Sequence, residues 1–579
     1  MDLLKKQITY SFLFLLKEIK NFFISFIELI RFFKRCNFFK YIKFYYSKNI
    51  NFFKDNNFNN FTKKNYDFWN NFSQNNNKGY LIVSCFVHTP GYYITNAIIA
   101  KYLAKIKKLD VICLIDENDL FGEVLLRSYG YKNFIYLPKS NFLIRYKFFL
   151  KSILITHQIK NLETLIKFKL NKINVGLSAY EHFLRHSGYG SIDKINFGLT
   201  YYLSQSIRIN SFAKSLFNKN KIKMMVQSEN QFLPCSLLFQ NSLKYKKRVF
   251  TREGGPQYCS VTMFRNLSDA FNGNASINKK LFYKIFKKYR KILSKKGSDL
   301  IKKRFEGIDL QNSVLFNNAF FKKNNTKKIN RSQFCKKFSL DPKKPIAYIL
   351  SNCLIDGNFV FGWRLFPNNL NLLQYQLKEA SKIKNVNWII KPHPLESFYK
   401  NAKTNTIKEF EKFNSFSHMK LMKNDHPSKK TISNTADVIL SCFGSAPIEY
   451  AAFGIPSILA AKSKYSYLKI FNNPTTINGY RKAMNSIGGL KKLSQIEIDK
   501  ANIWTFLTSE FIRIKINLLP KFNLLYKFEE YKSDFWVECI KNINSYNKKS
   551  DYFYTMFTHQ IKNQNQNLIN LEILKKNNL

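Results

Sequence analysis

The sequence predicts an α/β protein built around parallel sheets. Three stretches carry this prediction because each places short apolar runs beside helical or turn segments: residues 79–115, 386–394 and 436–460. The first reads as strand, loop, helix and strand, and the second as a buried strand that ends in a basic loop. The third reads as strand, Gly/Ser turn, short helix and strand. Strands that alternate with helices form parallel sheets covered on both faces, so we expect two such sheets.

Length and composition limit the classes of protein to consider. The chain has 579 residues, of which 45% are hydrophobic, and this is enough for two large domains with real cores. The formal net charge of +57 is spread along the whole chain, together with heavy use of Asn, Phe and Ile, which AT-rich codons encode. No zinc-finger spacing and no RNA-recognition signature is present, so we expect no nucleic-acid partner. The anionic partner is instead expected to be a nucleotide sugar, a phospholipid surface or an acidic glycan.

Changes in composition along the chain suggest four parts. Residues 1–77 are expected to form a basic amphipathic helix and an Asn/Lys/Phe-rich tether, and residues 78–330 a first α/β domain. A second α/β domain is expected at 331–490. Further helices follow at 491–579, where the last residues, 563–579, are expected to be a solvated tail.

Residues 6–35 predict a helix that lies on a membrane. At about 100° per residue the charged side chains gather on one face, and the opposite face is almost wholly apolar. Charges at Lys17, Glu18 and Lys20 interrupt the apolar stretch, so a membrane-spanning helix is not expected. We expect a basic amphipathic helix in the interface of the inner leaflet. The alternatives are a helix packed on the globular domains and a broken membrane anchor. The charged face consists of Lys17, Lys20, Glu28, Arg31 and Arg35.

The cysteines indicate a reducing compartment. All nine are scattered along the chain, and none belongs to a Cys-x-x-Cys pair. Several fall inside apolar, strand-like runs, where cysteine behaves as a small buried hydrophobe. No cleavable secretory signal is evident, because the apolar amino-terminal stretch carries charges throughout. We therefore expect a cytoplasmic protein that is peripheral at the inner face of the cytoplasmic membrane.

The turn at 441–445 has the composition of an anion site. A short apolar run suited to a buried strand ends at Ser441, and a helix starts just after the turn. Gly444 lets the backbone approach a ligand, and the Ser441 and Ser445 hydroxyls would join the free N–H groups of the helix start on a phosphate. Glu449, one turn into the helix, would accept hydrogen bonds from ribose or sugar hydroxyls.

A basic loop follows the strand that precedes this turn in sequence. Lys391 and His393 flank Pro392, and Pro394 follows, so two prolines stiffen the backbone around one histidine. A histidine held in this way can donate a hydrogen bond to a phosphate oxygen and stabilise a leaving nucleotide as negative charge develops. The alternative is a histidine that caps the strand end by bonding to a carbonyl group.

Residues 176–190 concentrate ionisable groups in the first domain. Glu181 is a candidate general base for an acceptor hydroxyl, and Arg185, one helical turn further on, is a candidate clamp for a carboxylate or phosphate. His182 and His186 have the i,i+4 spacing of metal ligands, but no third ligand is identifiable, so no metal site is expected. An ordinary polar helix face is the alternative for all four residues.

Two further loops follow apolar runs of the first domain. Glu229 follows the strand-like segment 224–227 and is the second candidate base, and Arg252 follows the segment 248–251 as a candidate ligand for phosphate or carboxylate. His88 also follows a strand-like run, and is as easily a turn histidine as a site residue. Neither Gly-x-Gly-x-x-Gly nor a P-loop is present, so no NAD or ATP site has a fingerprint here.

The second domain resembles capsular and surface polysaccharide biosynthesis proteins of the GT-B class, whose relatives include bacterial Kdo transferases and bacterial sialyltransferases. The His-Pro pair at 393–394 matches the family's His-Pro motif, and the segment 441–449 matches its Ser/Gly nucleotide-binding turn and helix. The resemblance is strong over about residues 340–480. In the first domain the family often has a Tyr-Asp stretch followed by Arg, where this chain has Glu181 in place of Asp.

The resemblance implies two Rossmann-like domains that face a central cleft, with nucleotide on the carboxyl-terminal domain and acceptor on the other. It implies a metal-independent glycosyltransferase without a cofactor, in which the donor is a nucleotide sugar and the acceptor a capsular, surface or lipid-linked glycan. The pairing of His-Pro and Ser motifs favours a CMP-activated acidic sugar. The alternatives are a nucleotide-sugar epimerase or polyol-phosphate transferase, and a non-catalytic glycan-binding or scaffold protein of polysaccharide export.

Overall fold

The computed structural model describes most of the chain, and by its internal contacts the chain divides into two compact units. The first unit comprises residues 1–180, 194–270 and 513–569, and the second comprises residues 181–193, 271–512 and 570–579. The described residues are 2–36, 53–70, 78–137, 141–159, 161–254, 257–271, 273, 277–306, 329–359, 362, 364–422, 428–520 and 533–576.

The first unit is built on a seven-stranded sheet with the order β12-β6-β5-β4-β1-β2-β3. The strands β1 to β5 are parallel, and β6 and β12 add an antiparallel edge. The chain order reverses at β1, whose Ile82 pairs with Ile112 of β2 on one side and with Met225 of β4 on the other. The strands are β1 (Tyr80–Cys85), β2 (Asp110–Asp116), β3 (Asn133–Leu137), β4 (Ile222–Gln227), β5 (Arg248–Gly254), β6 (Tyr258–Phe264) and β12 (Ile514–Lys515).

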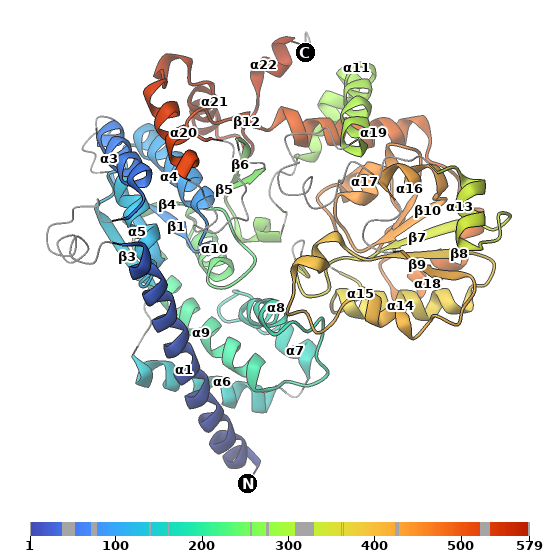
Figure 1. The fold of residues 1–579 in the computed structure, drawn as a ribbon, viewed down its shortest axis with the longest axis horizontal. Coiled ribbons are helices and arrows are strands. Elements are labelled where there is room, and N and C mark those ends of the chain that lie inside the picture. Colours follow the sequence, from blue (N-terminus) through green and yellow to red (C-terminus); the bar gives the residue numbers. More distant parts are fainter. Residues whose placement is uncertain are drawn as a thin grey trace. The chain divides into compact units, whose positions relative to one another are not determined.

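Helices lie on both sides of this sheet (Figure 1). On one face, α9 and α10 pack their apolar side chains, among them Phe217 and Phe239, against Ile82, Leu114 and Met225 of the strands. The helices are α1 (Asp2–Arg35), α3 (Asn56–Asn70), α4 (Pro90–Lys107), α5 (Leu120–Ser128), α6 (Phe142–Gln158), α7 (Leu162–Ile166), α9 (Phe197–Phe217), α10 (Cys235–Lys244), α20 (Ser533–Asn544) and α21 (Tyr552–Lys562). Helix α8 (Val175–Ser187) begins in the first unit, and its residues from Glu181 onward belong to the second.

Two segments of the first unit differ from expectation. The tether predicted within 1–77 is wrong for residues 56–70, which form α3 and bury Phe58, Phe61 and Trp69 against α5 and α20. The solvated tail predicted from residue 563 is wrong at Leu568, which is fully buried and donates its N–H to the Val261 carbonyl. In both places aromatic or aliphatic side chains find a surface to cover, and burial of that apolar area holds the segment down.

The second unit contains a five-stranded parallel sheet with the order β11-β10-β7-β8-β9. Neighbouring strand residues point to opposite faces. Ile349, Trp388 and Leu440 face the cluster formed with α14 and α18, whereas Tyr348 and Ile389 face the cluster formed with α13, α16 and α17. Figure 1 shows these helices on the two sides of the sheet. The strands are β7 (Ile346–Leu350), β8 (Asn387–Lys391), β9 (Met419–Leu421), β10 (Val438–Ser441) and β11 (Ser457–Leu459).

The helices of the second unit also explain why residues outside 331–490 group with it. Helix α11 packs along α19, and the backbone of Asn502 approaches Gly297 so closely that a Cβ there would lie 2.0 Å from the Asn502 carbonyl oxygen. The helices are α11 (Lys279–Phe305), α13 (Arg331–Phe338), α14 (Asn369–Lys382), α15 (Thr406–Glu411), α16 (Lys429–Thr435), α17 (Ala446–Ala451), α18 (Ile477–Asn485), α19 (Gln495–Phe506) and α22 (Leu571–Lys576). The contacts within each unit therefore join segments that lie on different sides of the domain boundaries predicted from the sequence.

In both sheets, the first strand of the unit (β1 or β7) lies in the middle of the parallel strands. The next two strands along the chain lie on one side of it, and the two after them lie on the other side. This order is that of Rossmann-like, doubly wound domains. The prediction of an α/β, GT-B-like chain with two Rossmann-like domains and a helical amino-terminal extension is confirmed. Among the residues that the structure describes, no helix is both long and apolar enough to cross a bilayer.

Candidate functional site

In the second unit, the strand order reverses between β7 and β10, and loops gather at the carboxyl ends of these strands. Ligands of doubly wound sheets bind at this position. Asn352, just beyond β7, accepts hydrogen bonds through Oδ1 from the Cys442 N–H (3.2 Å) and from the Ser441 hydroxyl (3.3 Å). The Ser351 N–H donates to the Lys391 carbonyl at 3.1 Å, so the ends of β7, β8 and β10 are tied together.

The predicted anion turn after β10 has a buried part and an exposed part. Ser441 is buried, and its hydroxyl also lies 3.2 Å from the Leu350 carbonyl oxygen, so it joins the ends of the neighbouring strands β10 and β7. Gly444 and Ser445 are exposed. Gly444 has a φ of +112°, a Cβ added there would meet nothing within 4 Å, and its carbonyl accepts a hydrogen bond from the Tyr465 hydroxyl (2.6 Å). The backbone at 444–445 is therefore exposed, and the buried Ser441 holds the start of the turn in place.

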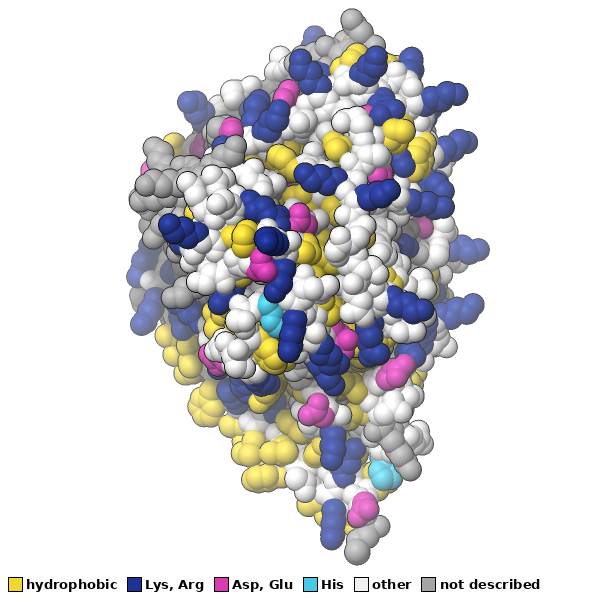
Figure 2. All heavy atoms as spheres, turned by 90° about the vertical axis from the view of Figure 1, so that its right-hand side faces the viewer, with side chains coloured by type: hydrophobic (Ala, Val, Ile, Leu, Met, Phe, Trp, Pro, Cys, Tyr) yellow, Lys and Arg dark blue, Asp and Glu magenta, His cyan; other side chains and the backbone are white. Residues whose placement is uncertain are grey.

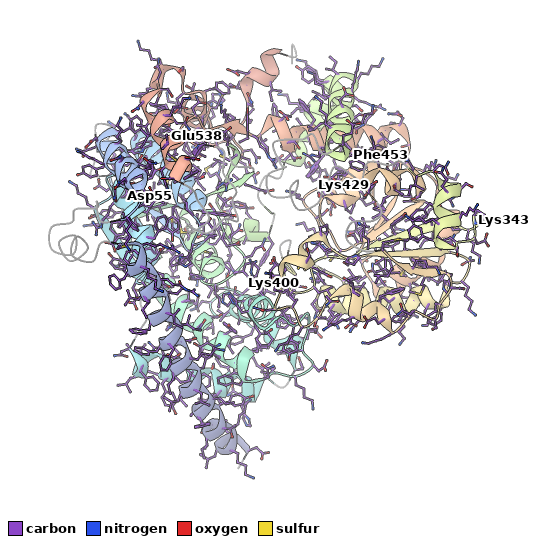
Figure 3. The ribbon with its side chains drawn as sticks, in the orientation of Figure 1. Asp55, Lys343, Lys400, Lys429, Phe453 and Glu538 are labelled. Carbon is purple, nitrogen blue, oxygen red and sulfur yellow. The ribbon has the colours of Figure 1, made fainter. Side chains whose placement is uncertain are left out.

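Glu449 lies deeper than the sequence suggests. Its side chain is buried, and its carboxylate oxygens lie 3.1 Å from Lys429 Nζ and 3.5 Å from an Arg304 nitrogen. Figure 3 labels Lys429, which belongs to α16. Two basic side chains therefore already engage this carboxylate and join α17 to α11 and α16. Its predicted contact with sugar hydroxyls stays a prediction.

His393 stands in the loop that follows β8. Pro394 begins the short 3-10 helix η3 (Pro394–Phe398), so the loop turns sharply at the end of the strand. Burial lowers the pKa of His393 to about 4, and the nearby charge of Asp356 only partly opposes this. The imidazole is therefore neutral near pH 7, with one nitrogen able to donate and the other able to accept. A neutral N–H donor suits a phosphate oxygen without adding a buried charge.

Asp356 is the carboxylate around which several predicted residues gather, and the sequence did not mark it as a site residue. Arg185 forms an ion pair with it, with Nη1 2.9 Å from Oδ1, and the Tyr399 hydroxyl donates to Oδ2. The Arg185 guanidinium also lies over the Tyr399 ring, 5.9 Å from its centroid. Asp356 in addition acts electrostatically on His393 and Glu181. The one available signal was the Asp356-Gly357 pair, a turn-forming dipeptide just after β7.

Glu181 is buried, with 4% of its surface exposed, and binds the loop after β7. Its Oε1 accepts a hydrogen bond from the Asn358 N–H at 2.7 Å. Burial raises the pKa of Glu181 to about 8, although hydrogen bonds from the Asn358 and Phe359 backbone and the charge of Arg364 work against the rise. The carboxyl group therefore carries a proton near pH 7 and fixes the 356–358 loop.

The wild type is expected to lose stability as the pH becomes alkaline, and Glu181→Gln is expected not to show this loss. The folded pKa of about 8 exceeds the ordinary value of 4.5, so the folded protein keeps a proton that the unfolded chain releases between these values. This stabilisation is complete below pH 4.5 and is lost as the pH rises through 8. Between about pH 5 and about pH 9, the unfolding free energy of the wild type should fall relative to Glu181→Gln by a few kcal/mol, to order of magnitude. Urea unfolding at both pH values measures this, and an unchanged difference would refute it.

Glu396 is a second buried carboxyl group that the sequence did not single out. It lies in η3, three residues after His393, and accepts hydrogen bonds from the Thr406 hydroxyl (2.8 Å) and N–H (3.1 Å). Burial raises the pKa of Glu396 to about 7, against the effect of these two hydrogen bonds. Nothing in the sequence around it distinguishes this glutamate from a surface residue.

The two histidines of α8 lie side by side, with ring centroids 4.2 Å apart. Burial lowers the pKa of His182 to about 3, and the charges of His186 and Arg185 lower it further. The described residues contain no group of three or more His, Cys, Asp or Glu side chains placed to hold a metal ion.

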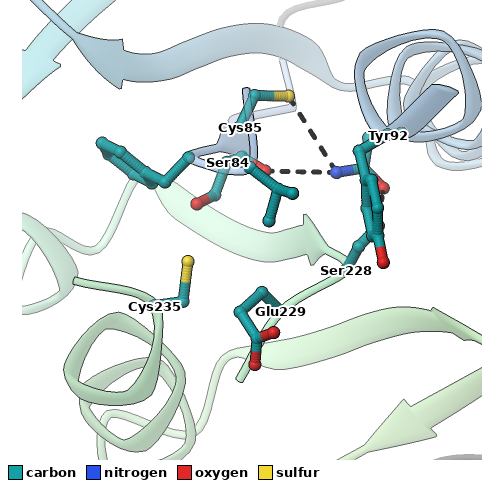
Figure 4. Close-up of a pocket in the computed structure, with 9 residues that line it drawn as sticks. Ser84, Cys85, Tyr92, Ser228, Glu229 and Cys235 are labelled. Atoms are coloured by element: carbon teal, nitrogen blue, oxygen red, sulfur yellow. Dashed lines mark hydrogen bonds between the residues drawn. The ribbon is translucent and has the colours of Figure 1, made fainter. Parts of the chain in front are cut away.

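In the first unit, a small pocket opens where the strand order reverses between β1 and β4 (Figure 4). About 190 Å³ of empty space, part of it open to solvent, lies among its lining residues. Glu229, at the end of β4, lines it and accepts hydrogen bonds through Oε1 from the N–H groups of Asn230 and Gln231, both at 2.7 Å. The Ser228 hydroxyl donates to Asn96 Oδ1 at 2.6 Å. The other lining residues are Ser84, Cys85, Phe86, Val87, Tyr92 and Cys235.

Arg252 reaches the same end of this sheet from β5. Its buried guanidinium lies over the ring of Tyr92, 5.5 Å from the centroid, and Tyr92 lines the pocket. His88 follows β1, and its Nδ1 lies 3.3 Å from Asp119, which also accepts a hydrogen bond from the Tyr93 hydroxyl. Glu229 and Arg252 thus belong to one pocket region of the first unit.

Comparisons with known proteins give shape likenesses only. No family model and no curated protein matches the chain. The β-Kdo 2,4 transferase of Thermosulfurimonas dismutans KpsC is 10% identical, with a TM-score of 0.31, over 52% of this chain and 83% of that one. The β-Kdo 2,7 transferase of the same KpsC is 14% identical, with a TM-score of 0.29, over 59% and 95%. The UDP-GlcNAc 2-epimerase of Neisseria meningitidis is 10% identical, with a TM-score of 0.24, over 74% and 99%. TM-scores this low carry no argument about activity.

Proposed function

We propose that this protein is a glycosyltransferase that takes a sugar from a nucleotide-activated donor. The observation that carries the proposal is that the 391–394 loop and the 441–445 turn flank the end of β7, both at the carboxyl ends of the second unit's strands. Backbone groups at 444–445 are open there, and His393 offers a neutral N–H donor. This is the position at which doubly wound sheets bind nucleotides.

The chemistry required of this site is stabilisation of a leaving nucleotide. As the bond between sugar and phosphate breaks, negative charge grows on the phosphate oxygens, and hydrogen-bond donors fixed beforehand stabilise it. Lys391, His393 and Ser445 are the donors that the chain provides, and none of them is an acidic metal ligand. These donors are proposed to contact the phosphate directly, in a metal-independent transferase without a cofactor.

Between the two candidate bases, the surroundings favour Glu229 over Glu181. Glu181 is buried, holds its proton near pH 7 and is occupied by the Asn358 backbone, so it positions the loop that carries Asp356. Glu229 lines a pocket, and its Oε1 accepts hydrogen bonds from two backbone N–H groups. We assign Glu229 as the base that activates the acceptor hydroxyl and Arg252 as a ligand for an acidic group of the acceptor. In the second unit, Arg185 is assigned to hold Asp356.

The proposed substrates follow from the motif resemblance and agree with the charge of the chain. A CMP-activated acidic sugar as donor and a capsular, surface or lipid-linked glycan as acceptor suit a chain with a net charge of +57 and these arginines. The reaction is proposed to take place at the inner face of the cytoplasmic membrane, where a lipid-linked acceptor would be found. Donor identity is the part of this proposal that rests most on the motif resemblance.

A second candidate function, nucleotide-sugar epimerisation, has one observation in its favour. Glu396 has a pKa of about 7 and lies three residues from His393, and a carboxyl group poised near neutral pH can exchange protons with a bound sugar. An epimerase would leave the bond between sugar and nucleotide intact, or reform it, and would incorporate solvent deuterium into the sugar.

Mass spectrometry of a panel of CMP-, CDP-, UDP- and GDP-sugars incubated with the protein in D₂O separates these functions. The transferase proposal predicts slow release of free nucleotide from one donor, faster when a glycan acceptor is added. An isomerised sugar carrying deuterium, with no nucleotide released, would establish the epimerase instead. Absence of any change in every donor, with and without acceptor, would contradict both and leave a binding or scaffold role.

A further inference from the structure

Helix α1 turns its polar side chains toward the protein. Glu18 forms an ion pair with Arg145 of α6 at 2.7 Å and accepts a hydrogen bond from the Tyr201 hydroxyl of α9 at 3.1 Å. Asn21 Nδ2 donates to the same hydroxyl at 2.9 Å, and Phe14 is buried beside it. The helix is therefore packed on the first unit, which was one sequence-based alternative, through a face that combines Glu18 and Asn21 with the buried Phe14.

The opposite face of α1 is apolar and exposed. Thirteen large hydrophobic side chains between Leu4 and Ile30 have 40% to 68% of their surface exposed. The first turn of α6, which contacts α1 through Phe142 and Phe14, adds Leu143, 72% exposed. Figure 2 shows hydrophobic side chains gathered toward the lower left of the molecule. The exposed set on α1 is Leu4, Ile8, Phe12, Leu15, Leu16, Ile19, Phe22, Phe23, Ile24, Phe26, Ile27, Leu29 and Ile30.

Basic side chains follow one edge of this apolar face. The helix has 34 residues and is therefore about 50 Å long. At about 100° per residue, four exposed cations fall within roughly 80° of one another, beside the apolar sector and away from the face that packs on α6 and α9. Long basic side chains in this position can extend to lipid headgroups while apolar neighbours enter the acyl region. These cations are Lys5, Lys20, Arg31 and Lys34.

We propose that the exposed face of α1, together with the first turn of α6, docks in the interface of an anionic phospholipid bilayer. Helix α1 would be the surface by which the proposed transferase meets the membrane, and to that extent this inference rests on the proposed function. The polar contacts of Glu18 and Asn21 hold the apolar face outward, so no refolding is needed for it to meet a membrane. The helix lies in the plane of the interface rather than across it, since its charges at Lys17, Glu18 and Lys20 exclude a span.

A bilayer fits this surface better than a second copy of the chain. Two copies meeting through α1 would bring their rows of basic side chains together, and like charges at an interface disfavour association. Arg31 is already paired with Glu28, with Nη1 2.6 Å from Oε1, whereas anionic headgroups complement Lys5, Lys20 and Lys34, at about 1 kcal/mol per Lys near the surface. The excess of cations over acidic groups along the exposed edge therefore selects a negatively charged lipid surface.

Vesicle co-sedimentation of the full chain tests this surface. The probe is large vesicles of phosphatidylcholine, with or without about 30% phosphatidylglycerol, at low and high salt. The wild type should bind the anionic vesicles more tightly than the neutral ones, and high salt should weaken binding. The triple variant Phe12→Ser, Phe23→Ser, Phe26→Ser should bind about a hundredfold more weakly. The control is Ile292→Ser, Ile407→Ser, Ile496→Ser, which removes isoleucines elsewhere that are 41% to 50% exposed, against 52% to 62% for the three phenylalanines, and should bind like the wild type.

Each other outcome overturns the proposal. Absence of wild-type binding, or equal binding by the triple variant, would exclude α1 as the docking surface. Self-association of the wild type in sedimentation velocity, abolished in the triple variant and accompanied by no vesicle binding, would assign the surface to a second copy. Nucleotide release from the donor is measured on the same samples without vesicles. A failure of the proposed function can then be told apart from a failure of membrane docking. A triple variant that keeps this activity but loses vesicle binding is folded and supports the proposal.

Discussion

Replacing His393 with alanine should lower the rate of nucleotide release from the donor by about 10²–10³-fold, the usual effect of removing one donor from a site of developing charge. The neutral imidazole is assigned to donate to a phosphate oxygen whose charge grows as the sugar leaves. The interaction strengthens in the transition state, so kcat should fall more than the KM for the donor rises. Initial rates across a range of donor concentrations measure both parameters.

His418→Ala is the matched control for this prediction. His418 precedes β9, at the opposite end of the same sheet, and one of its ring nitrogens lies 3.1 Å from the Ala380 carbonyl oxygen. The same substitution there removes a histidine hydrogen bond without touching the proposed site, so activity per folded molecule should be retained. Equal losses in the two variants would mean that His393 acts through stability alone.

The protonation state of His393 determines the pH range over which the rate should stay constant. Burial lowers its pKa to about 4 from an ordinary value of 6.5. The stability associated with the neutral ring is complete above pH 6.5 and is lost as the pH falls through 4, because the unfolded chain takes up the proton first. His393 should therefore cause no loss of rate between about pH 6 and about pH 8.

Replacing Glu229 with glutamine should lower transfer to the acceptor by about 10²–10⁴-fold, the range for loss of a general base. Glutamine keeps the shape of the side chain and can still accept hydrogen bonds from the Asn230 and Gln231 N–H groups, so the pocket should persist. Because the nucleotide is assigned to the second unit, its affinity should be unchanged. Acceptor-dependent product formation by mass spectrometry, together with a nucleotide titration, measures the two effects separately.

The comparison with Glu181→Gln decides between the two candidate bases. The assignment predicts a small effect of Glu181→Gln on the rate near pH 7, because Glu181 already holds a proton there. Complete loss of transfer in Glu181→Gln with full activity in Glu229→Gln would reverse the assignment. Loss in both variants with intact nucleotide binding would indicate that Glu181 positions the loop of Asp356 more tightly than glutamine can.

The parallel strands were predictable because their chemistry is local. Segments such as Ile346–Leu350 and Val438–Ser441 are buried on both faces, so they appear in the sequence as uninterrupted apolar runs. The loops after them could be placed at one edge of a sheet for the same reason. Helix α3 was missed although Phe58, Phe61, Asn65 and Trp69 have the spacing of one helical face. Its abundant Asn and Lys masked that period.

The candidate site was predictable only where its residues are neighbours in sequence. The pairing of Arg185 with Asp356 joins residues 171 positions apart, and no local pattern reports it. Burial is equally hidden, since Glu181 and Glu449 read as exposed helix residues and both lie inside the protein. The sequence of α1 revealed an amphipathic helix, but which face meets the protein depends on Arg145 and Tyr201, more than a hundred residues away.

Calorimetric titration of CMP, CDP, UDP and GDP into the wild type and His393→Ala tests whether the second unit holds a nucleotide at His393. We expect one nucleotide to bind the wild type selectively, and its Kd to rise by at least about tenfold in His393→Ala, the effect of losing one hydrogen bond to a charged group. Binding of no nucleotide to the wild type, or equal binding to both proteins, would contradict a nucleotide site at the carboxyl ends of β7, β8 and β10.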